Sequence, residues 1–201
     1  MGIVLYGVEG PTDAPVAEKL INWVGCVPQL VSARGGKSQV DERLRHWNKA
    51  SNTQPFLVLR DWDPSDSASC IPGLLDRLLG GQILAPRLAL RIPVRSVEAW
   101  LMADTDSFKQ YFKTTKVPKD PDGEDDPKRA LVNACRHSRS ATIRKDIVPR
   151  PGSGRVVGEL YSHRIIDFAS NHWDPDRARR NSPSLDRALN RLTQLVTAGL
   201  W

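Results

Sequence analysis

The sequence predicts an α/β domain with a mainly parallel sheet, followed by a helical extension. Short apolar runs alternate with segments of helical periodicity over residues 1–105, a pattern typical of α/β folds. The run Pro55–Leu59 is apolar on both faces, as is usual in the middle of a parallel sheet. Beyond residue 105 the pattern indicates only loops and helices.

The alternating segments define four strands and four helices. The expected strands are Ile3–Val8, Val27–Ala33, Pro55–Leu59 and Leu88–Val94. The expected helices are Thr12–Val24, Ser38–Ala50, one that contains Leu74–Leu79 and one that begins with Val97–Ala103. Thr12 is a suitable N-cap for the first of these helices, in which Val16 and Leu20 fall on one apolar face.

The second half of the chain has a different character. Loops are expected over 113–127 and 149–154, which are rich in proline and glycine. Helices are expected over Lys128–Cys135, Val156–Ser170 and Pro183–Thr197. We therefore expect residues 1–105 to form the α/β core and residues 106–201 to pack on that same core, giving one domain overall.

Composition excludes several classes of protein. The chain of 201 residues contains no run of 18 apolar residues and begins without a secretory signal pattern, so no membrane span is expected. Its three scattered cysteines favour buried thiols in a reducing compartment, and we expect a cytoplasmic protein.

Positive charge is concentrated in one segment. Eight basic residues and one acidic residue lie between Lys128 and Arg155, a local net charge of +7, whereas the whole chain carries +6. Such a segment indicates either a polyanionic partner, with nucleic acid the first candidate, or an ordinary solvated face.

Carboxylates follow two of the predicted strands. Glu9 ends the first strand, and Asp61 and Asp63 follow the third. Loops at the carboxyl ends of parallel strands line the ligand crevice, and side chains two residues apart point the same way. Clustered carboxylates repel one another unless a cation lies between them, and Mg²⁺ or Mn²⁺ suits such oxygen ligands.

Structural explanations of the same residues stay open. Glu9 and Gly10 can belong to an ordinary turn, and an aspartate after a strand is often a turn former or helix cap. Asp13 can simply place negative charge in the first turn of its helix. The position of Glu9 and the Asp61/Asp63 pair at equivalent strand ends favours a metal site.

A glycine turn precedes the second predicted helix. Val31 stands where a P-loop needs a glycine, so the segment is not a P-loop. Gly36, Lys37 and Ser38 can still hold a phosphate through backbone N–H groups at the helix N-terminus, and a plain loop is the alternative.

The segments "VEGPTD" and "FLVLRDWD" together resemble the TOPRIM domain of topoisomerases, primases, small ribonucleases and overcoming-lysogenization-defect (OLD) nucleases. The resemblance implies that Glu9 is a general acid/base or metal ligand and that Asp61 and Asp63 bind metal. "IPVRSVEAWLMAD" is similar to a signature of bacterial TOPRIM proteins related to OLD nucleases. It implies a fourth acidic site residue at Glu98, which could instead cap its helix or pair with Arg95.

The resemblance implies a Mg²⁺- or Mn²⁺-dependent nuclease in defence against phage or mobile DNA, acting with an AAA- or ABC-type ATPase partner. Asp13 and Glu98 would support the metal site. The basic residues expected to contact nucleic acid are Arg95, Arg136, Arg139, Arg144 and Lys145. The alternative is a TOPRIM-like module that binds nucleic acid or protein without catalysis. The oligomeric state stays open, with a homodimer among the candidates.

Overall fold

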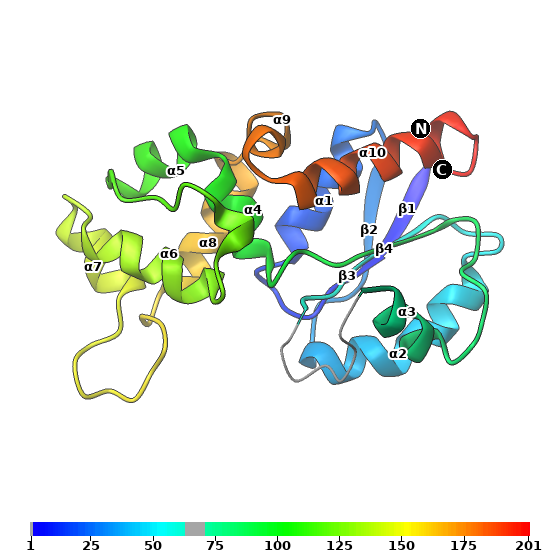
Figure 1. Ribbon diagram of the computed structural model, residues 1–201, viewed down its shortest axis with the longest axis horizontal. Coiled ribbons are helices and arrows are strands. Elements are labelled where there is room, and N and C mark those ends of the chain that lie inside the picture. Colours follow the sequence, from blue (N-terminus) through cyan, green and yellow to red (C-terminus); the bar gives the residue numbers. More distant parts are fainter. Residues whose placement is uncertain (1, 63–70) are drawn as a thin grey trace. The chain divides into compact units, whose positions relative to one another are not determined.

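The computed structural model describes residues 2–62 and 71–201, and these contain a four-stranded parallel sheet with helices on both faces (Figure 1). The strands are β1 (Ile3–Gly7), β2 (Val27–Ser32), β3 (Phe56–Leu59) and β4 (Leu88–Arg91). They lie in the order β2-β1-β3-β4, and all three pairings are parallel. The predicted α/β class and the predicted strands are confirmed, with strand ends shifted by up to three residues.

The helices of the described residues number ten, together with two short 3₁₀ segments. They are α1 (Ala14–Trp23), α2 (Gly36–Ala50), α3 (Ile71–Leu79), α4 (Val97–Ala103), α5 (Thr105–Phe112), η1 (Pro121–Gly123), α6 (Pro127–Arg136), α7 (Ala141–Ile147), α8 (Tyr161–Asn171), α9 (Pro175–Ala178), η2 (Arg179–Asn181) and α10 (Pro183–Thr197). The sequence analysis missed α5, α7 and α9, which are all short.

Three predicted helix starts were wrong by two residues or more, among them that of α2, which begins at Gly36 rather than Ser38. Helix α1 begins at Ala14, and its N-cap is Asp13 rather than Thr12, because the turn before it is closed by the Asp13 side chain on the Gly10 amide. Helix α8 begins at Tyr161 rather than Val156. The amide of Gly158 instead donates to the Ile147 carbonyl at 2.8 Å, at the end of α7.

The chain divides into two compact units. The first contains Met1–Pro93 and Arg187–Trp201, and the second contains Val94–Asp186. These limits differ from the expected division after residue 105, and helix α10 contributes residues to both units. The expectation that residues 106–201 share the core of the sheet stays a prediction.

In the first unit, helices cover both faces of the sheet. Figure 1 shows α2 and α3 on one face, and α1 with the last turns of α10 on the other. The face toward α2 and α3 contains an apolar cluster in which Leu44, Trp47, Phe56 and Val58 are buried, with the Trp47 and Phe56 rings 5.2 Å apart. The parallel pairing of β1 with β3 places their carboxyl ends at one edge of the sheet, where Gly7 pairs with Val58.

We expect Gly7→Ala to destabilise the protein by about 1–3 kcal/mol, the usual cost of overpacking a filled core. A Cβ at Gly7 would lie 2.5 Å from the Trp47 ring, which is itself fixed against Phe56. Urea denaturation followed by tryptophan fluorescence measures the loss. The control is Gly2→Ala, where a Cβ meets only backbone of Trp201 at 3.6 Å. Equal stability of the two variants would contradict the packing argument.

The second unit has its own buried interior. Every residue of α4 is buried. The Trp100 indole donates to Ser184 Oγ at 2.7 Å, and the Trp173 indole donates to the Trp100 carbonyl at 3.0 Å. Phe108, Phe112 and Phe168 pack ring against ring. These contacts fix α5 and α8 against each other within the unit.

Candidate active site at the ends of β1 and β3

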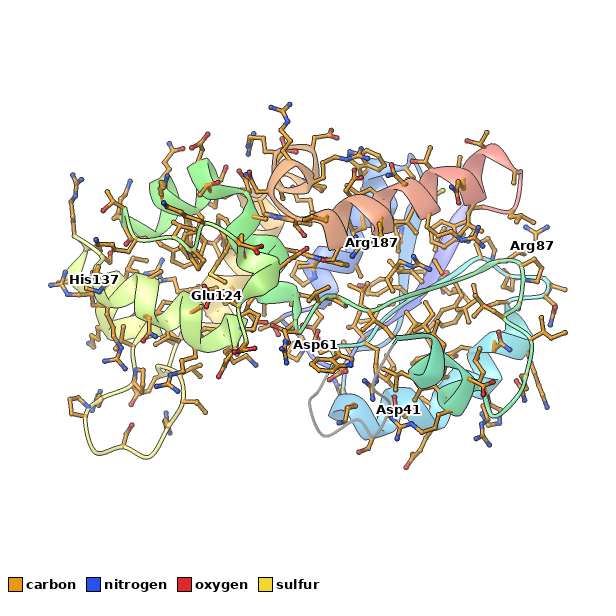
Figure 2. The ribbon with its side chains drawn as sticks, in the orientation of Figure 1. Asp41, Asp61, Arg87, Glu124, His137 and Arg187 are labelled. Carbon is orange, nitrogen blue, oxygen red and sulfur yellow. The ribbon has the colours of Figure 1, made fainter. Side chains whose placement is uncertain are left out.

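Glu9 and Asp61, two of the predicted site residues, lie within hydrogen-bonding distance at the carboxyl edge of the sheet. Glu9 follows β1, and its Oε1 accepts a hydrogen bond from the Asp61 amide at 2.9 Å. Asp61 follows β3, and its position is labelled in Figure 2. The parallel pairing of β1 with β3 causes this contact, because residues just beyond Gly7 and Val58 remain neighbours.

The Glu9 carboxyl holds its proton more tightly than an ordinary glutamate. Burial raises its pKa from 4.5 to about 7, because the charged form is poorly solvated. The hydrogen bond from the Asp61 amide lowers the pKa, the Asp13 carboxylate raises it, and Arg60 lowers it. A carboxyl group with a pKa near neutrality is suited to accept and release protons in catalysis.

Asp13 is buried and takes part in the turn between β1 and α1. Its Oδ2 accepts from the Gly10 amide at 2.9 Å, and its Oδ1 accepts from Thr12 Oγ1 at 3.3 Å. This is a structural role, although it differs from the helix-dipole role that the sequence analysis left open for Asp13. Its charge still bears on the site, because it raises the pKa of Glu9.

The remaining predicted acidic residues are not described at this edge. Asp63 lies outside the described residues. Glu98 belongs to the second unit, where it is 2% exposed and accepts a hydrogen bond from the Tyr161 hydroxyl at 2.9 Å. Lys128 Nζ lies 3.7 Å from the same carboxylate. Ser96 is the N-cap of α4, so Glu98 is not the helix cap. Arg95 forms an ion pair with Asp125.

Arg60 and Asp41 form part of the site, and the sequence analysis did not find either. Arg60 follows β3 and is completely buried. Its Nε and Nη2 each donate to the Asp41 carboxylate at 3.1 Å, and its Nη1 donates to the Asp61 carbonyl at 2.8 Å. Asp41 comes from α2, and Figure 2 labels it together with Asp61.

The Asp61 peptide is therefore held from both sides. Glu9 accepts its N–H, and Arg60 donates to its C=O. Arg60 is in turn fixed by the paired hydrogen bonds to Asp41, a geometry that strengthens and orients an arginine–carboxylate contact. This arrangement fixes the backbone from which the Asp61 carboxylate projects.

The start of α2 lies beside the same edge. The Gly36 amide donates to the Glu9 carbonyl at 3.1 Å, so this N–H is already used within the protein. The predicted phosphate contacts of this segment therefore depend on Lys37 and Ser38. Gly35 and Gly36 both have positive φ, which allows the chain to turn sharply into the helix.

Arg91 is a cationic candidate that the sequence analysis missed. It ends β4 and is half-buried, and its Nε has no hydrogen-bond partner in the described structure. Burial lowers the pKa of its guanidinium to about 10, with a smaller effect from Arg191. Two guanidinium groups close enough to affect each other's charge favour binding of an anion.

The predicted basic contacts lie in the second unit. Arg136 and Arg139 are exposed, and Lys145 borders a small hollow with Arg150. Arg144 is partly used in the fold, because its Nη1 donates to the Ser138 carbonyl. Arg95 has positive φ and pairs with the exposed Asp125 at 2.9 Å. Arg139 also lines a hollow of about 540 Å³ in the second unit.

The chemistry of Glu9 and Asp61 fits a hard divalent cation. Both offer carboxylate oxygens, and a bound cation would offset the burial that raises the pKa of Glu9. Among the described residues, no group of three or more His, Cys, Asp or Glu side chains is arranged to hold a metal ion. The predicted ligand Asp63 is not among those residues.

Together these features define an α/β protein with two carboxylate residues in contact at the carboxyl edge of a parallel sheet. Comparisons with protein-family models, curated proteins and solved structures each find no match. In residues 2–62 and 71–201, no helix combines the length and apolar character that crossing a membrane would need.

Proposed function

We propose that this protein is a metal-dependent nuclease that hydrolyses phosphodiester bonds in DNA or RNA on a TOPRIM-like fold. The observation that carries the proposal is the contact between Glu9 and Asp61 at neighbouring strand ends, with the pKa of Glu9 near 7. The topology supports a ligand site at this edge, because crevices at the carboxyl ends of parallel strands are the usual binding sites of α/β proteins.

Glu9 and Asp61, with Asp63, would hold Mg²⁺ or Mn²⁺, which when bound supplies an activated water and stabilises the charge on the transferring phosphoryl group. In the other role that the resemblance implies, as a general acid/base instead of a metal ligand, Glu9 would exchange a proton with water or with the leaving oxygen near neutral pH. Arg60 and Asp41 keep the Asp61 backbone in place.

Charge on the phosphate needs cationic partners. Lys37 at the start of α2 and Arg91 at the end of β4 both belong to the first unit and lie on elements that border the carboxyl edge of the sheet. Such groups stabilise negative charge that develops during phosphoryl transfer. Of these two cations, Arg91 has the more specific structural support, because its buried Nε has no hydrogen-bond partner in the described structure.

The wider biological role rests on the sequence resemblance alone. A role in defence against phage or mobile DNA, an ATPase partner and a cytoplasmic location are therefore parts of the proposal that the resemblance to OLD-related proteins supports. The proposal that Asp13 and Glu98 support the metal site rests on the same resemblance.

A non-catalytic nucleic-acid-binding module is the second candidate. The observation that favours it is a group of exposed cations around hollows in the second unit, which does not depend on Glu9 or Asp61. Under this alternative, nucleic acid would bind whether or not divalent metal is present, and no cleavage would follow.

The deciding experiment incubates the protein with plasmid DNA and with RNA in Mn²⁺ or Mg²⁺. Glu9→Gln and Asp61→Asn are compared with wild type, and calorimetry measures Mn²⁺ binding by each. Asp76→Asn, which removes an exposed carboxylate of α3, is the matched control. We expect metal-dependent cleavage by wild type and the control only. Equal behaviour of all four proteins, without metal binding, would show that the nuclease proposal is wrong.

A further inference from the structure

Two adjoining hollows occur on the second unit beside α5. One has a volume of about 540 Å³ and the other about 480 Å³. Gln110 and Lys113 line both of them, so the two hollows meet at the end of α5. Each lies within the range of volumes that is usual for ligand pockets.

The charged residues that line the larger hollow are mainly cationic. Lys109, Lys113 and Arg139 contribute to its wall, against a single carboxylate from Asp106. All three cations are exposed, and within residues 71–201 none of them is held in an ion pair. Cations that are not neutralised by the protein itself are available to bind an anionic ligand.

The backbone beneath these cations is firmly held. The Arg139 amide donates to the Lys113 carbonyl at 2.8 Å, and Ser138 Oγ donates to the Phe112 carbonyl at 2.6 Å. Thr114 Oγ1 donates to the Ala134 carbonyl at 2.8 Å. Lys113 adopts a left-handed conformation with φ of 51°, which is unusual for a residue other than glycine. These bonds join the end of α5 to the segment before α7 and keep Lys113 beside Arg139.

The smaller hollow adds aromatic surface. Tyr111 and His172 line it with their ring centroids 4.7 Å apart, and His172 is exposed. The Tyr111 hydroxyl donates to Asp167 at 2.6 Å, which fixes the phenol ring. Arg177 lines the same hollow, but it pairs with Asp104 at 3.0 Å and contributes less free charge.

We propose that these hollows bind single-stranded nucleic acid, with backbone phosphates against Lys113 and Arg139 and a base against the Tyr111–His172 pair. Binding of single strands combines a cationic groove with aromatic rings on which bases stack. Unstacked bases are exposed in a single strand and hidden in a duplex. This inference names the form of substrate for the nuclease proposed above and in that respect rests on it.

Binding is measured without catalysis, so that the two proposals fail separately. Fluorescence anisotropy follows fluorescein-labelled dT12 and U12 in EDTA, with a 12-base-pair duplex as competitor. The test variants are Lys113→Glu/Arg139→Glu and His172→Ala. The control is Lys119→Glu/Arg129→Glu, which makes the same change of charge at two exposed residues that line neither hollow.

We expect the Lys113→Glu/Arg139→Glu variant to bind the single strands at least about tenfold more weakly than the control. We also expect its plot of log binding constant against log salt concentration to have a slope shallower by about 1.4, because two phosphate contacts are lost. We expect His172→Ala to bind at least about fivefold more weakly than wild type, the loss expected from one stacked base. Tight binding of dT12 and U12 by the Lys113→Glu/Arg139→Glu variant would overturn the proposal. So would a duplex that competes as well as a single strand, or an unchanged affinity of His172→Ala.

Discussion

Glu9→Gln is expected to abolish metal-dependent cleavage and, in the absence of metal, to make the protein more stable at pH 8. Both effects come from one property of Glu9, its partial burial beside Asp61 and Asp13. Glutamine keeps the shape and can still accept the hydrogen bond from the Asp61 amide. The substitution therefore removes the charge and the proton exchange with little change of packing.

The loss of activity should be about 10²–10⁴-fold, the usual contribution of a positioned general acid or base. Initial rates of oligonucleotide cleavage in Mn²⁺ measure it. Asp76→Asn, on the exposed side of α3, should cleave like wild type. Cleavage by Glu9→Gln within a factor of two of wild type would exclude Glu9 from the chemistry.

The change in stability follows from the direction of the pKa shift. The pKa of Glu9 is about 7 in the folded protein against an ordinary value of 4.5, so the folded state binds more protons between these pH values. The contribution of Glu9 to stability is fully present below pH 4.5 and is lost as the pH rises through 7. Glutamine does not titrate, so the variant avoids this loss.

After allowance for the solvent that reaches Glu9, we expect the gain at pH 8 to be about 1–2 kcal/mol. Urea denaturation in EDTA at pH 4.5 and pH 8 measures it for wild type, Glu9→Gln and Asp76→Asn. The difference between Glu9→Gln and wild type should be larger at pH 8 than at pH 4.5. A constant difference at the two pH values would mean that the Glu9 pKa is not raised.

The contact between Glu9 and Asp61 could be predicted from the sequence because it follows from local patterns and parallel topology. The apolar runs of β1 and β3 each identify a strand, and the residues just beyond each strand end then lie at a known edge. The strand limits need be correct only to within one or two residues for this inference to hold.

The pairing of Arg60 with Asp41 could not be predicted in the same way. The two residues come from a strand end and a helix separated by 19 positions, and their contact depends on how α2 packs on the sheet. An arginine after an apolar strand is also normally exposed to solvent, whereas Arg60 is completely buried. Similarly, the late start of α8 depends on the close approach of Gly158 to the backbone of residues 146 and 147.

Removal of either partner of the Arg60–Asp41 pair is expected to destabilise the first unit strongly. Asp41→Leu leaves the completely buried Arg60 guanidinium without its carboxylate, and Arg60→Met leaves the Asp41 carboxylate and the Asp61 carbonyl without their donor. Breaking a buried ion pair by removal of one partner typically costs about 3–5 kcal/mol, and Arg60→Met should cost less than Asp41→Leu because the Asp41 side chain is 28% exposed. Urea denaturation at pH 7 measures each variant.

The control for these variants is Arg150→Met, which removes one partner of the exposed pair between Arg150 and Glu159, 3.6 Å apart. Exposed pairs contribute at most about 1 kcal/mol, so Arg150→Met should remain close to wild type. If Asp41→Leu were no more destabilising than Arg150→Met, the pair would not contribute in the way its burial indicates.

The double variant Asp41→Leu/Arg60→Met separates stability from positioning. Because neither charge is then left alone, its loss of stability should be smaller than the sum of the two single losses by at least about 1 kcal/mol. Cleavage should nevertheless stay low, because the Asp61 peptide has lost the hydrogen bond that Arg60 donates to its carbonyl. A double variant that is stable and fully active would show that Arg60 stabilises the fold without positioning Asp61. A stable but inactive one would place Arg60 and Asp41 in the machinery that orients the metal ligand.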